Sequence, residues 1–480
     1  MPNMLQTAVE SLASEAAASP FDAVIVGAGS AGLTTALVLA EHGRKVALLE
    51  AGPAPFLTHI SNTDLRFAPA LARDVRSAVQ YSPALAAGGT FGNNYGCLGG
   101  RGLFWNGATP RYSAAELDGW PFGEAELTGE YDWAEAAFRV TRSLGQGALG
   151  GRIIGRLRDA GFAAEPGPFA CDDAQTMPGR LSAGIGSGLG FFFRMAGAAV
   201  AQGAIRVATG THVARVLVSN GTAKGVVVVG NGAAILEIPA RAVVLAGGGI
   251  ESIKLAALSG VPDPHARIGR GLQEHLFYHG LFAAPGLFDP QVAEAAVVYV
   301  PAAAQDGHQW ELHAPGDRLF SVDGISPWRP DASAPYQIMI RSFAATEKRD
   351  GNFVEAREGG LGSAVVHFTH SEADEAAKAR IVASAQRLTM ALGLEPTDAA
   401  GVAGAARFRA PGSSYHEAGG LDMGLDARTS VTDPDGRFHH VPNLVSADAA
   451  AFPRISATNP HLTIVAVAHR KAAALAARLN

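Results

Sequence analysis

Three glycines and one acidic residue have the spacing that binds a dinucleotide. Gly27, Gly29 and Gly32 follow the pattern G-x-G-x-x-G, and Glu50 lies 18 residues after the third glycine. Glycines at such a turn let backbone amides reach a pyrophosphate at the N-terminus of the next helix, and the acid accepts a hydrogen bond from a ribose hydroxyl. These four residues therefore predict a nucleotide-binding site.

The segments around these residues have the periodicity of a strand–helix–strand unit. Residues 23–26 are an uninterrupted apolar run, which is typical of a buried parallel strand. Residues 30–42 repeat apolar side chains at the helical period until Gly43, and residues 45–49 form a second strand that ends at Glu50. Such a unit can also carry a glycine turn that binds nothing, but the glycines, the helix and the acid together favour the nucleotide site.

Two later segments extend the same sheet. Residues 204–230 read as strand, turn and strand, and residues 240–260 read as a strand that passes through a glycine turn into a helix. We expect the backbone around Val213 to contact an adenine ring. The turn itself does not separate FAD from NAD, but no second glycine fingerprint follows it, which favours one permanently held dinucleotide.

The composition excludes several classes of protein. A chain of 480 residues predicts two domains, and a net charge of −6 does not favour a nucleic-acid partner. No apolar run approaches the roughly 18 residues of a membrane span. Residues 1–20 hold two glutamates and no basic segment, so we expect a helix or a frayed lead-in there and not a secretory signal. Because Cys97 and Cys171 are the only cysteines, we expect no disulfide framework, no metal site and a cytoplasmic protein.

Compact, glycine-punctuated motifs alternate along the chain with less patterned segments. The motifs lie in residues 20–115, 200–275 and 415–480, and the less patterned segments are residues 116–199 and 276–414. This alternation predicts a discontinuous arrangement in which the first three segments form a nucleotide-binding domain and the other two form a substrate-binding domain.

Four motifs, in order, resemble the glucose–methanol–choline (GMC) family of flavoprotein oxidoreductases. GAGSAG at residues 27–32 is similar to the family's FAD fingerprint, and AGGGIESIKLAALSG at residues 246–260 is similar to A-G-x-x-x-S-x-x-L-L-x-x-S-G. GRGLQEHL at residues 269–276 is similar to G-x-x-L-x-D-H, with Glu274 where Asp is usual. The segment at residues 446–472 is similar to the block D-x-S-x-x-P…N-P-x-x-T-I-x-A-x-A-x-R.

The resemblance implies an α/β fold with a Rossmann-type FAD-binding domain and a discontinuous substrate domain built on an antiparallel sheet. It also implies that FAD oxidises an alcohol to a carbonyl by hydride transfer to the flavin N5, with oxygen or a quinone as electron acceptor. A small-molecule alcohol is the expected partner, neither a nucleic acid nor a membrane is expected, and a homo-oligomer stays open.

A glycine-rich segment with two adjacent aromatics, GCLGGRGLFWNGATPR at residues 96–111, refines the resemblance. It is most similar to the pyranose-oxidase branch, whose segment runs G-G-x-x-x-H-W-T-x-A-T-P-R and whose histidine bonds covalently to the flavin. Phe104 occupies that position here, and a phenyl ring offers no nucleophile, so the resemblance implies non-covalent FAD. Asn106 replaces the threonine, and we expect Trp105 to support the segment from behind.

The residues expected to hold the cofactor come from all of these motifs. They include Asp448 near the pyrophosphate and a helix that begins near Pro460, whose positive end would face the flavin pyrimidine. The full set is Gly27, Gly29, Ser30, Ala31, Gly32, Glu50, Ala51, Gly99, Gly100, Phe104, Trp105, Asn106, Gly107, Ala108, Val213, Ala246, Gly247, Asp448, Asn459, Pro460, His461 and Thr463.

Oxidation of an alcohol needs a base for the hydroxyl proton and a polar group that orients the alcohol. His416 lies in H-x-x-G-x-x-x-M-G, similar to the family's H-x-x-G-T-x-x-M-G, and is assigned as the general base. Asn459, where the family has its second active-site residue, is assigned as its partner, with His461 as the rival. We expect His275 to pack near the flavin domain, with a cofactor contact left open.

The substrate is not determined by any motif. The leading interpretation is a ring hydroxyl of a sugar or glycoside, because of the pyranose-oxidase-like segment. An aromatic or polycyclic alcohol, a non-redox lyase with structural FAD, and a non-catalytic flavin protein are the alternatives. Asp422 replaces an arginine of the family's histidine motif, and this loss of a cation weighs against an acidic substrate. Five aromatics could stack on a substrate or form core: Trp310, Phe320, Trp328, Tyr336 and Phe343.

Overall fold

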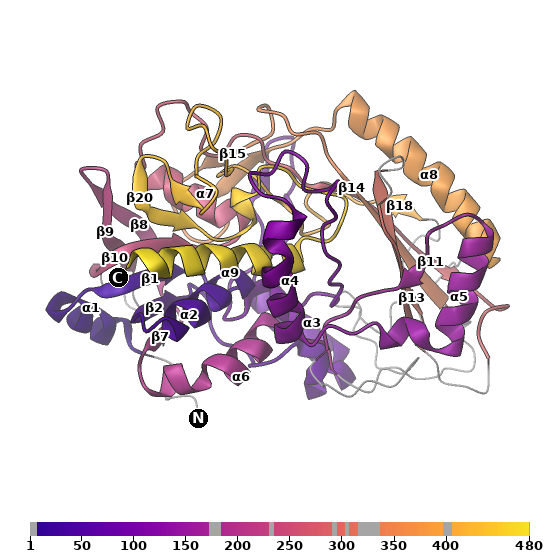
Figure 1. Ribbon diagram of the computed structural model, residues 1–480, viewed down its shortest axis with the longest axis horizontal. Helices are drawn as coiled ribbons and strands as arrows, with labels where there is room; N and C mark the ends of the chain where they lie inside the picture. The colour runs from indigo at the N-terminus through magenta and orange to yellow at the C-terminus, as the bar shows by residue number, and fades with distance from the viewer. Residues whose placement is uncertain are drawn as a thin grey trace.

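Two large sheets lie side by side and carry most of the helices on their outer faces (Figure 1). No described helix is long and apolar enough to cross a bilayer. The computed structural model describes residues 7–171, 184–229, 235–289, 295–302, 307–314, 337–396 and 406–479.

The first sheet is parallel at its centre. β1 pairs in parallel with β10 and β2, and α2 (Ser30–Glu41) connects β1 to β2, so the predicted strand–helix–strand unit is confirmed. All four residues of β2 are buried, as an apolar run in a parallel sheet should be. In spatial order the strands are β19 (Arg437–Phe438), β20 (Val441–Ser446), β10 (Ile235–Leu245), β1 (Phe21–Val26), β2 (Val46–Leu49) and β7 (Ile205–Ala208).

An antiparallel ribbon and several helices complete this part of the molecule. β8 (His212–Ser219) pairs with β9 (Thr222–Val229), which pairs with the extended β10. Residues 204–230 thus hold three strands and not the two expected, because β7 joins the parallel sheet beside β2. The helices of this part are α1 (Val9–Ala18), α3 (Pro69–Val79), α4 (Glu124–Phe138), α6 (Gly188–Ala201), α7 (Gly249–Leu258) and α9 (His461–Arg478).

The second sheet is antiparallel throughout, which confirms the predicted fold class. One face packs against α5 (Ala148–Asp159) and α8 (Glu372–Leu392) in an apolar core, seen in Figure 1 on the side away from the first sheet. In spatial order the strands are β17 (Glu395–Pro396), β11 (His275–Ala283), β14 (Gln337–Ala345), β13 (His308–Ala314), β12 (Ala296–Val300) and β6 (Glu165–Pro166), and β18 (Arg407–Phe408) also pairs with β11.

The proposed division into two domains stays a prediction, and helix packing bears on its boundaries. Helix α4 and most of α6 lie in residues 116–199, yet α4 contacts α9 and α6 contacts α2. These helices therefore cover the first sheet, whereas α5 from the same segment covers the second. The small strands form separate sheets, β15 (Phe353–Ala356) with β16 (Ala364–His367) and β4 (Ala84–Leu85), and β3 (Gln80–Tyr81) with β5 (Asn94–Tyr95).

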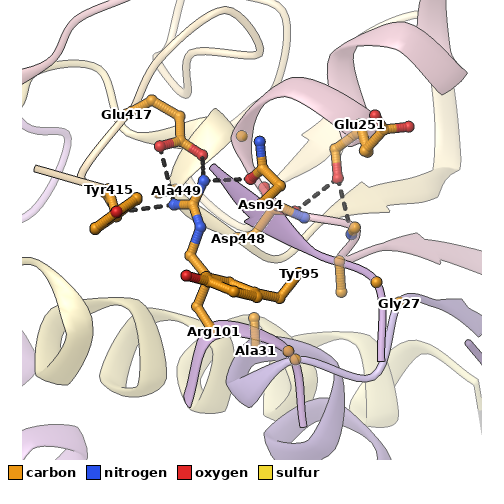
Figure 2. Close-up of a pocket in the computed structure, with 18 of the residues that line it drawn as sticks. Gly27, Ala31, Asn94, Tyr95, Arg101, Glu251, Tyr415, Glu417, Asp448 and Ala449 are labelled. Atoms are coloured by element: carbon orange, nitrogen blue, oxygen red, sulfur yellow. Dashed lines mark hydrogen bonds and ion pairs between the residues drawn. The ribbon is translucent and has the colours of Figure 1, made fainter. Parts of the chain in front are cut away.

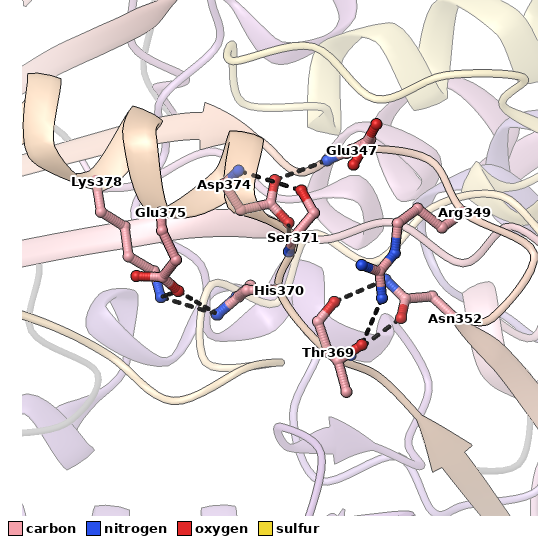
Figure 3. A network of polar contacts seen from close by, with 9 residues as sticks. All are labelled: Glu347, Arg349, Asn352, Thr369, His370, Ser371, Asp374, Glu375 and Lys378. Atoms are coloured by element: carbon pink, nitrogen blue, oxygen red, sulfur yellow. Dashed lines mark hydrogen bonds and ion pairs between the residues drawn. The ribbon is translucent and has the colours of Figure 1, made fainter.

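A polar network joins the end of β14 to the start of α8 (Figure 3). Ser371 and Asp374 form a reciprocal capping box at the N-terminus of α8. The Asp374 carboxylate also accepts a 2.8 Å hydrogen bond from the backbone amide of Glu347, just after β14. Asn352 and Thr369 exchange two further hydrogen bonds between neighbouring loops. The network fixes α8 relative to the sheet that it covers.

Candidate active site

A cavity of about 750 Å³ lies between the two sheets. Its lining includes the last residues of β1, β2 and β10, namely Val26, Leu49 and Leu245. These are carboxyl ends of adjacent parallel strands, where α/β sheets bind their ligands. From the second sheet it includes Phe277 and Phe343, so the cavity runs from the nucleotide motif to the inner face of the antiparallel sheet.

The glycine turn is shaped for close backbone approach. Gly27 has a φ of +99°, and a Cβ there would lie 2.4 Å from the carbonyl oxygen of Ala246. Gly29 begins α2 with no side-chain cap, and a Cβ on it would meet no protein atom within 4 Å. The uncapped amides at this helix start therefore face open space, which is the arrangement that binds a phosphate.

Glu50 lies buried at the end of β2, where the motif requires it. Its carboxylate accepts hydrogen bonds from the backbone amides of Ala28 at 3.0 Å and Gly52 at 2.9 Å. Burial raises its pKa to about 7, against the lowering effect of these amides. The acid is thus held firmly at the mouth of the glycine turn, beside the position of a ribose.

Asp448 connects the last sequence motif to the second glycine turn. Its carboxylate accepts from the backbone amide of Gly248 at 2.8 Å and from the Ser252 hydroxyl at 2.6 Å. It also caps the following short turn by accepting from the backbone amide of Ala450 at 3.0 Å. Segments about 200 residues apart in sequence therefore meet at the cavity wall.

Arg101 is the centre of a polar cluster in the cavity (Figure 2). Its guanidinium pairs with the carboxylate of Glu417, donates to the side-chain oxygen of Asn94 and donates to the backbone oxygen of Tyr415 at 2.8 Å. Tyr415 has a φ of +62°, an unusual conformation for a non-glycine residue, directly before His416. The cluster fixes the backbone that carries the predicted base.

Aromatic contacts order the glycine-rich segment. Phe104 stacks on Tyr95 with ring centroids 4.5 Å apart, and Trp105 stacks on His461 at 4.0 Å. The other edge of His461 contacts the Ser30 hydroxyl at 3.0 Å, at the start of α2. His461 therefore contacts both Trp105 and the start of α2, on the side of the cavity where the glycine turn lies.

His416 and His275 form an imidazole pair at the end of the cavity where Phe343 of the second sheet lies 5.1 Å from the His416 ring. The Nδ1 atoms of the two rings are 2.9 Å apart, and Nε2 of His275 lies 2.5 Å from the backbone oxygen of Ser456. A carbonyl oxygen only accepts, so His275 carries its proton on Nε2 and its Nδ1 accepts from Nδ1–H of His416. This chain leaves Nε2 of His416 unprotonated.

Both imidazoles of this pair are held neutral. Burial lowers the pKa of His275 to about 3. His416 lines the cavity, yet the surrounding protein lowers its pKa well below 6.5, through burial first and then through His275 and Arg101. A neutral His416 with a free Nε2 is the form that accepts a proton.

Asn459 lies in the same part of the cavity and is positioned by the second sheet. Its side-chain oxygen accepts a hydrogen bond from the amide of Gln309 on β13. The Glu311 carboxyl, two residues further along that strand, lies near the amides of Asn459 and Asn106, but neither of its oxygens makes a well-formed hydrogen bond with a described residue. Burial raises the pKa of Glu311 to about 7.

Most of the residues predicted from the sequence line this one cavity. Those that do are Gly27, Gly29, Ser30, Ala31, Glu50, Ala51, Gly100, Phe104, Trp105, Asn106, Ala108, Val213, Ala246, Gly247, His416, Asp448, Asn459, Pro460 and His461. Among the described lining, four of the predicted residues are missing, namely Gly32, Gly99, Gly107 and Thr463.

These four residues have structural roles around the cavity. Gly32 lets α2 pack on the turn, because a Cβ there would lie 1.9 Å from the oxygen of Gly27. Gly99 and Gly107 have φ values of +96° and +81° and shape the ends of the glycine-rich segment. Thr463 faces away and shares a 2.8 Å hydrogen bond with a tyrosine hydroxyl on α4.

Several contacts of the site have no signal in the motifs. Arg101 is an unspecified position of the glycine-rich segment. His275, the histidine of the motif at residues 269–276, is expected to pack near the flavin domain, with a cofactor contact left open, and not to pair with His416. The alternation of polar and apolar residues in HQWELH, residues 308–313, was the available signal for Gln309 and Glu311, because it marks a strand with one polar face.

The position of Asp422 changes one inference about the substrate. Its carboxylate is buried, pairs with Lys348 and accepts from the backbone amide of Gly420 at 2.9 Å. Neither residue 420 nor residue 422 lines the cavity. The absence of an arginine at position 422 therefore carries no information about an acidic substrate. Of the predicted stacking aromatics, Phe343 lines the cavity, Trp310 is core, and residues 320, 328 and 336 lie outside the described residues.

Two family models and a cofactor-domain model match the chain. Models described as GMC oxidoreductase match residues 195–277 and 352–468. A model described as FAD dependent oxidoreductase matches residues 22–65, which hold the glycine turn and Glu50. The matched segments include the imidazole pair and Asn459.

Curated relatives match along nearly the whole chain. Paromamine 6'-oxidase of Streptomyces fradiae is 26% identical, over 96% of this chain and 92% of the relative. A C-glycoside 3-oxidase of Microbacterium trichothecenolyticum is 27% identical, over 94% of this chain and 95% of the relative.

Solved structures share the fold at low sequence identity. Pyridoxine 4-oxidase from Mesorbium loti superposes with a TM-score of 0.66 at 19% identity, covering 94% of this chain and 98% of that one. A variant of formate oxidase from Aspergillus oryzae RIB40 superposes with a TM-score of 0.70 at 15% identity, covering 96% and 98%.

Proposed function

This chain belongs to the GMC oxidoreductase family and is an FAD-dependent oxidoreductase, and we propose that it oxidises a ring hydroxyl of a sugar or glycoside to a carbonyl. The observation that carries the proposal is the imidazole pair: His416 has a free Nε2 at the cavity wall, with Asn459 in the same lining. The names of two relatives, oxidases of paromamine and of C-glycosides, support the substrate class.

The residues of the cavity fit FAD. The uncapped amides of α2 and the bare Gly29 suit the pyrophosphate, and Glu50 suits the ribose. We propose that residues 104–108 border the isoalloxazine and that the flavin is held without a covalent bond, because Phe104 offers no nucleophile. When bound, FAD supplies the oxidant that accepts a hydride from the alcohol carbon.

The proposed role of His416 is to remove the hydroxyl proton. Its Nε2 is unprotonated because Nδ1–H is donated to His275, and the ring is neutral because its pKa is lowered. Removal of the proton lets the alcohol carbon become a carbonyl without developing positive charge, and a positioned base typically contributes about 10²–10⁴-fold to such a step. His275 acts through His416 and is a positioning residue.

The proposed role of Asn459 is to orient the alcohol oxygen. Gln309 occupies its side-chain oxygen, and the Glu311 carboxyl lies near its NH₂ group, which has a second hydrogen to donate to the substrate. Phe343 stacks on Phe277 at 4.8 Å and lies 5.1 Å from the His416 ring, so an apolar wall closes the other side. A sugar ring has hydroxyl edges and apolar C–H faces that match these two surfaces.

The alternatives fit the cavity less well. An aromatic alcohol would use the Phe277–Phe343 wall but leave the polar side of the sheet unsatisfied. A lyase with structural FAD would need neither a base with a fixed tautomer nor an oriented amide at the same end of the cavity. The pairing of both features favours redox chemistry on a polyhydroxy substrate.

Anaerobic mixing of the yellow holoenzyme with sugars and glycosides tests the proposal. We expect an effective substrate to bleach the oxidised flavin absorbance, and His416→Ala to slow that reduction by about 10²–10⁴-fold while FAD content is kept. His440→Ala is the matched control, because His440 is an exposed histidine on a turn near the same end of the sequence.

Two outcomes would overturn these assignments. Turnover of a substrate with an unbleached flavin would exclude redox chemistry and favour the lyase. Reduction of the flavin at the wild-type rate in His416→Ala would exclude His416 as the base.

A further inference from the structure

The cations that line the cavity divide into two kinds. Arg101 is paired with Glu417, and Lys254 is paired with Glu251 at 2.6 Å. Arg341 and Arg409 also line the cavity, but neither forms an ion pair with a described residue. The two paired cations support the walls, whereas no described residue forms an ion pair with the guanidinium group of either arginine.

Strand register places these arginines at the substrate end. Arg341 on β14 is the direct neighbour of His279 on β11. The backbone amide of Arg409 donates to the oxygen of Phe277 at 2.8 Å, so Arg409 flanks the other side of β11. Phe277 and His279 share a face of β11 because they are two residues apart, and both line the cavity. The two arginines therefore flank one stretch of cavity wall.

The acid beside Arg341 balances its charge only in part, because Arg341 lowers the pKa of Glu311 but burial is the larger effect. Glu311 is its direct neighbour on β13, but Nε of Arg341 and both Glu311 oxygens lack a hydrogen-bond partner among the described residues. Glu311 is only 2% exposed and does not line the cavity, and burial raises its pKa to about 7, so near neutral pH it is partly protonated. Burial first, and then Arg341, Arg409 and Arg407, lower the pKa of His279 to about 3.

We propose that Arg341 and Arg409 form an anion-binding subsite for the substrate, so that the preferred sugar carries a carboxylate or a phosphate. Guanidinium groups bind both of these anions through paired hydrogen bonds. The proposal rests on the proposed oxidation of a sugar hydroxyl and adds a charged group to its substrate.

The subsite lies at a suitable distance from the reacting atoms. Phe343 contacts His416, and Arg341 is two residues before Phe343 on β14, which is about 7 Å along a strand. A sugar ring with its reacting hydroxyl at His416 can therefore direct an acidic substituent toward the arginines. Because this spacing keeps the arginines away from the imidazole pair, the proposed role of the subsite is to recognise the substrate and not to take part in the reaction.

Binding to the oxidised holoenzyme tests the subsite without requiring turnover. Dissociation constants are measured from the perturbation of flavin absorbance by D-glucuronate, D-glucose 6-phosphate and D-glucose at one low ionic strength. We expect at least one of the two acidic sugars to bind about tenfold or more tightly than glucose. The two acidic sugars distinguish a carboxylate site from a phosphate site. Equal affinity for all three sugars, or no binding of either acidic sugar, would overturn the proposal.

Single variants localise the effect. Arg341→Gln and Arg409→Gln should each weaken binding of the acidic sugar by about tenfold or more and leave the affinity for glucose unchanged. Arg380→Gln is the matched control, because Arg380 on α8 is exposed and does not line the cavity. The flavin potential of the substrate-free Arg341→Gln protein should equal that of the wild type. If both variants still bind the acidic sugar more tightly than glucose, the arginines do not form the subsite. If the flavin potential changes while the sugar affinities do not, the arginines act on the flavin and not on the substrate.

Failure of this inference is distinguishable from failure of the proposed function. If glucose bleaches the flavin but the acidic sugars bind no better, the oxidation stands and the anion subsite is wrong. If an acidic sugar binds through the arginines but no sugar bleaches the flavin, the subsite stands and the oxidation is wrong.

Discussion

At the scale of single residues, the site depends on a backbone oxygen that fixes the protonation of two histidines. The oxygen of Ser456 requires the proton of His275 on Nε2, and His275 in turn requires the proton of His416 on Nδ1. A neutral imidazole in water exchanges between its two tautomers. This series of hydrogen bonds selects the tautomer in which Nε2 of His416 is unprotonated. The tautomer, and not only the presence of a histidine, makes the group a base.

The imidazole pair predicts the acid limb of the pH profile. His416 must be neutral to act, and its pKa is lowered, so activity should persist as pH falls through 6.5 and be lost only well below that value. The rate of anaerobic flavin reduction by a sugar, measured from pH 5 to 8, checks this. An acid limb at or above pH 6.5 that disappears in His416→Ala would contradict it.

Removal of the partner ring provides the companion measurement. His275→Phe keeps an aromatic ring but removes the acceptor of Nδ1–H and one cause of the lowered pKa of His416. We expect reduction to slow by about tenfold or more and the acid limb to move to higher pH. A variant with wild-type rate and profile would mean that His275 only fills space.

At the scale of elements, two glycines of the turn after β1 meet different requirements, one from the fold and one proposed for the ligand. Gly27 is needed by the protein, because its φ is positive and the β10 end presses against it. The fold does not require Gly29, because its φ of −73° suits any residue and its Cβ position is open, so we infer that its requirement comes from the ligand. The same motif would then contain one residue selected by folding and one selected by binding.

A pair of alanine variants tests this separation. Gly27→Ala should destabilise the FAD-free protein by about 1 kcal/mol or more, because it combines a strained φ with a close contact. Gly29→Ala should leave the melting temperature of the FAD-free protein unchanged. It should weaken FAD binding by about tenfold or more, because the added methyl group would occupy the expected position of the phosphate. Thermal melts and FAD titration measure both. Equal loss of stability in the two variants would contradict the assignment.

At the scale of the whole molecule, the cavity is lined by segments that lie far apart in the chain and come from both large sheets. Its lining comes from the ends of β1, β2 and β10, from residues 93–108, from β11 and β14, and from residues 448–464. Arg101 connects residues 93–108, which include its partner Asn94, to a further lining segment that holds Tyr415 and Glu417. A ligand that fills the cavity therefore bridges both sheets.

Removal of FAD should consequently lower the stability of the entire chain. A ligand at 100 times its dissociation constant stabilises the folded state by about 2.7 kcal/mol. We expect the melting temperature of the FAD-free protein to rise by several degrees on reconstitution with FAD, and to rise less with ADP, which fills only the nucleotide end. Equal stabilisation by ADP and FAD would show that the flavin half contributes nothing to cohesion between the sheets.

The nucleotide half of the site was determined by the sequence. Gly27, Gly29 and Glu50 lie within one strand–helix–strand unit, so their positions follow from local spacing, and their proposed contacts with the cofactor follow from those positions. The antiparallel second sheet and the placement of His416 and Asn459 at one cavity were also expected, from the order of the motifs. Their catalytic roles remain predictions.

Only the tertiary structure decided which side chains act on one another. His275 and His416 are 141 residues apart, Gln309 and Asn459 are 150 apart, and nothing in either local sequence marks the partner. Arg341 and Arg409 join one wall because β11 lies between β14 and β18. Hydrogen bonds and charges act over a few ångströms in space, whereas spacing along the chain reports only on neighbours within an element. The tautomer of His416 and the meeting of Arg341 and Arg409 at one cavity wall therefore depend on the folded chain.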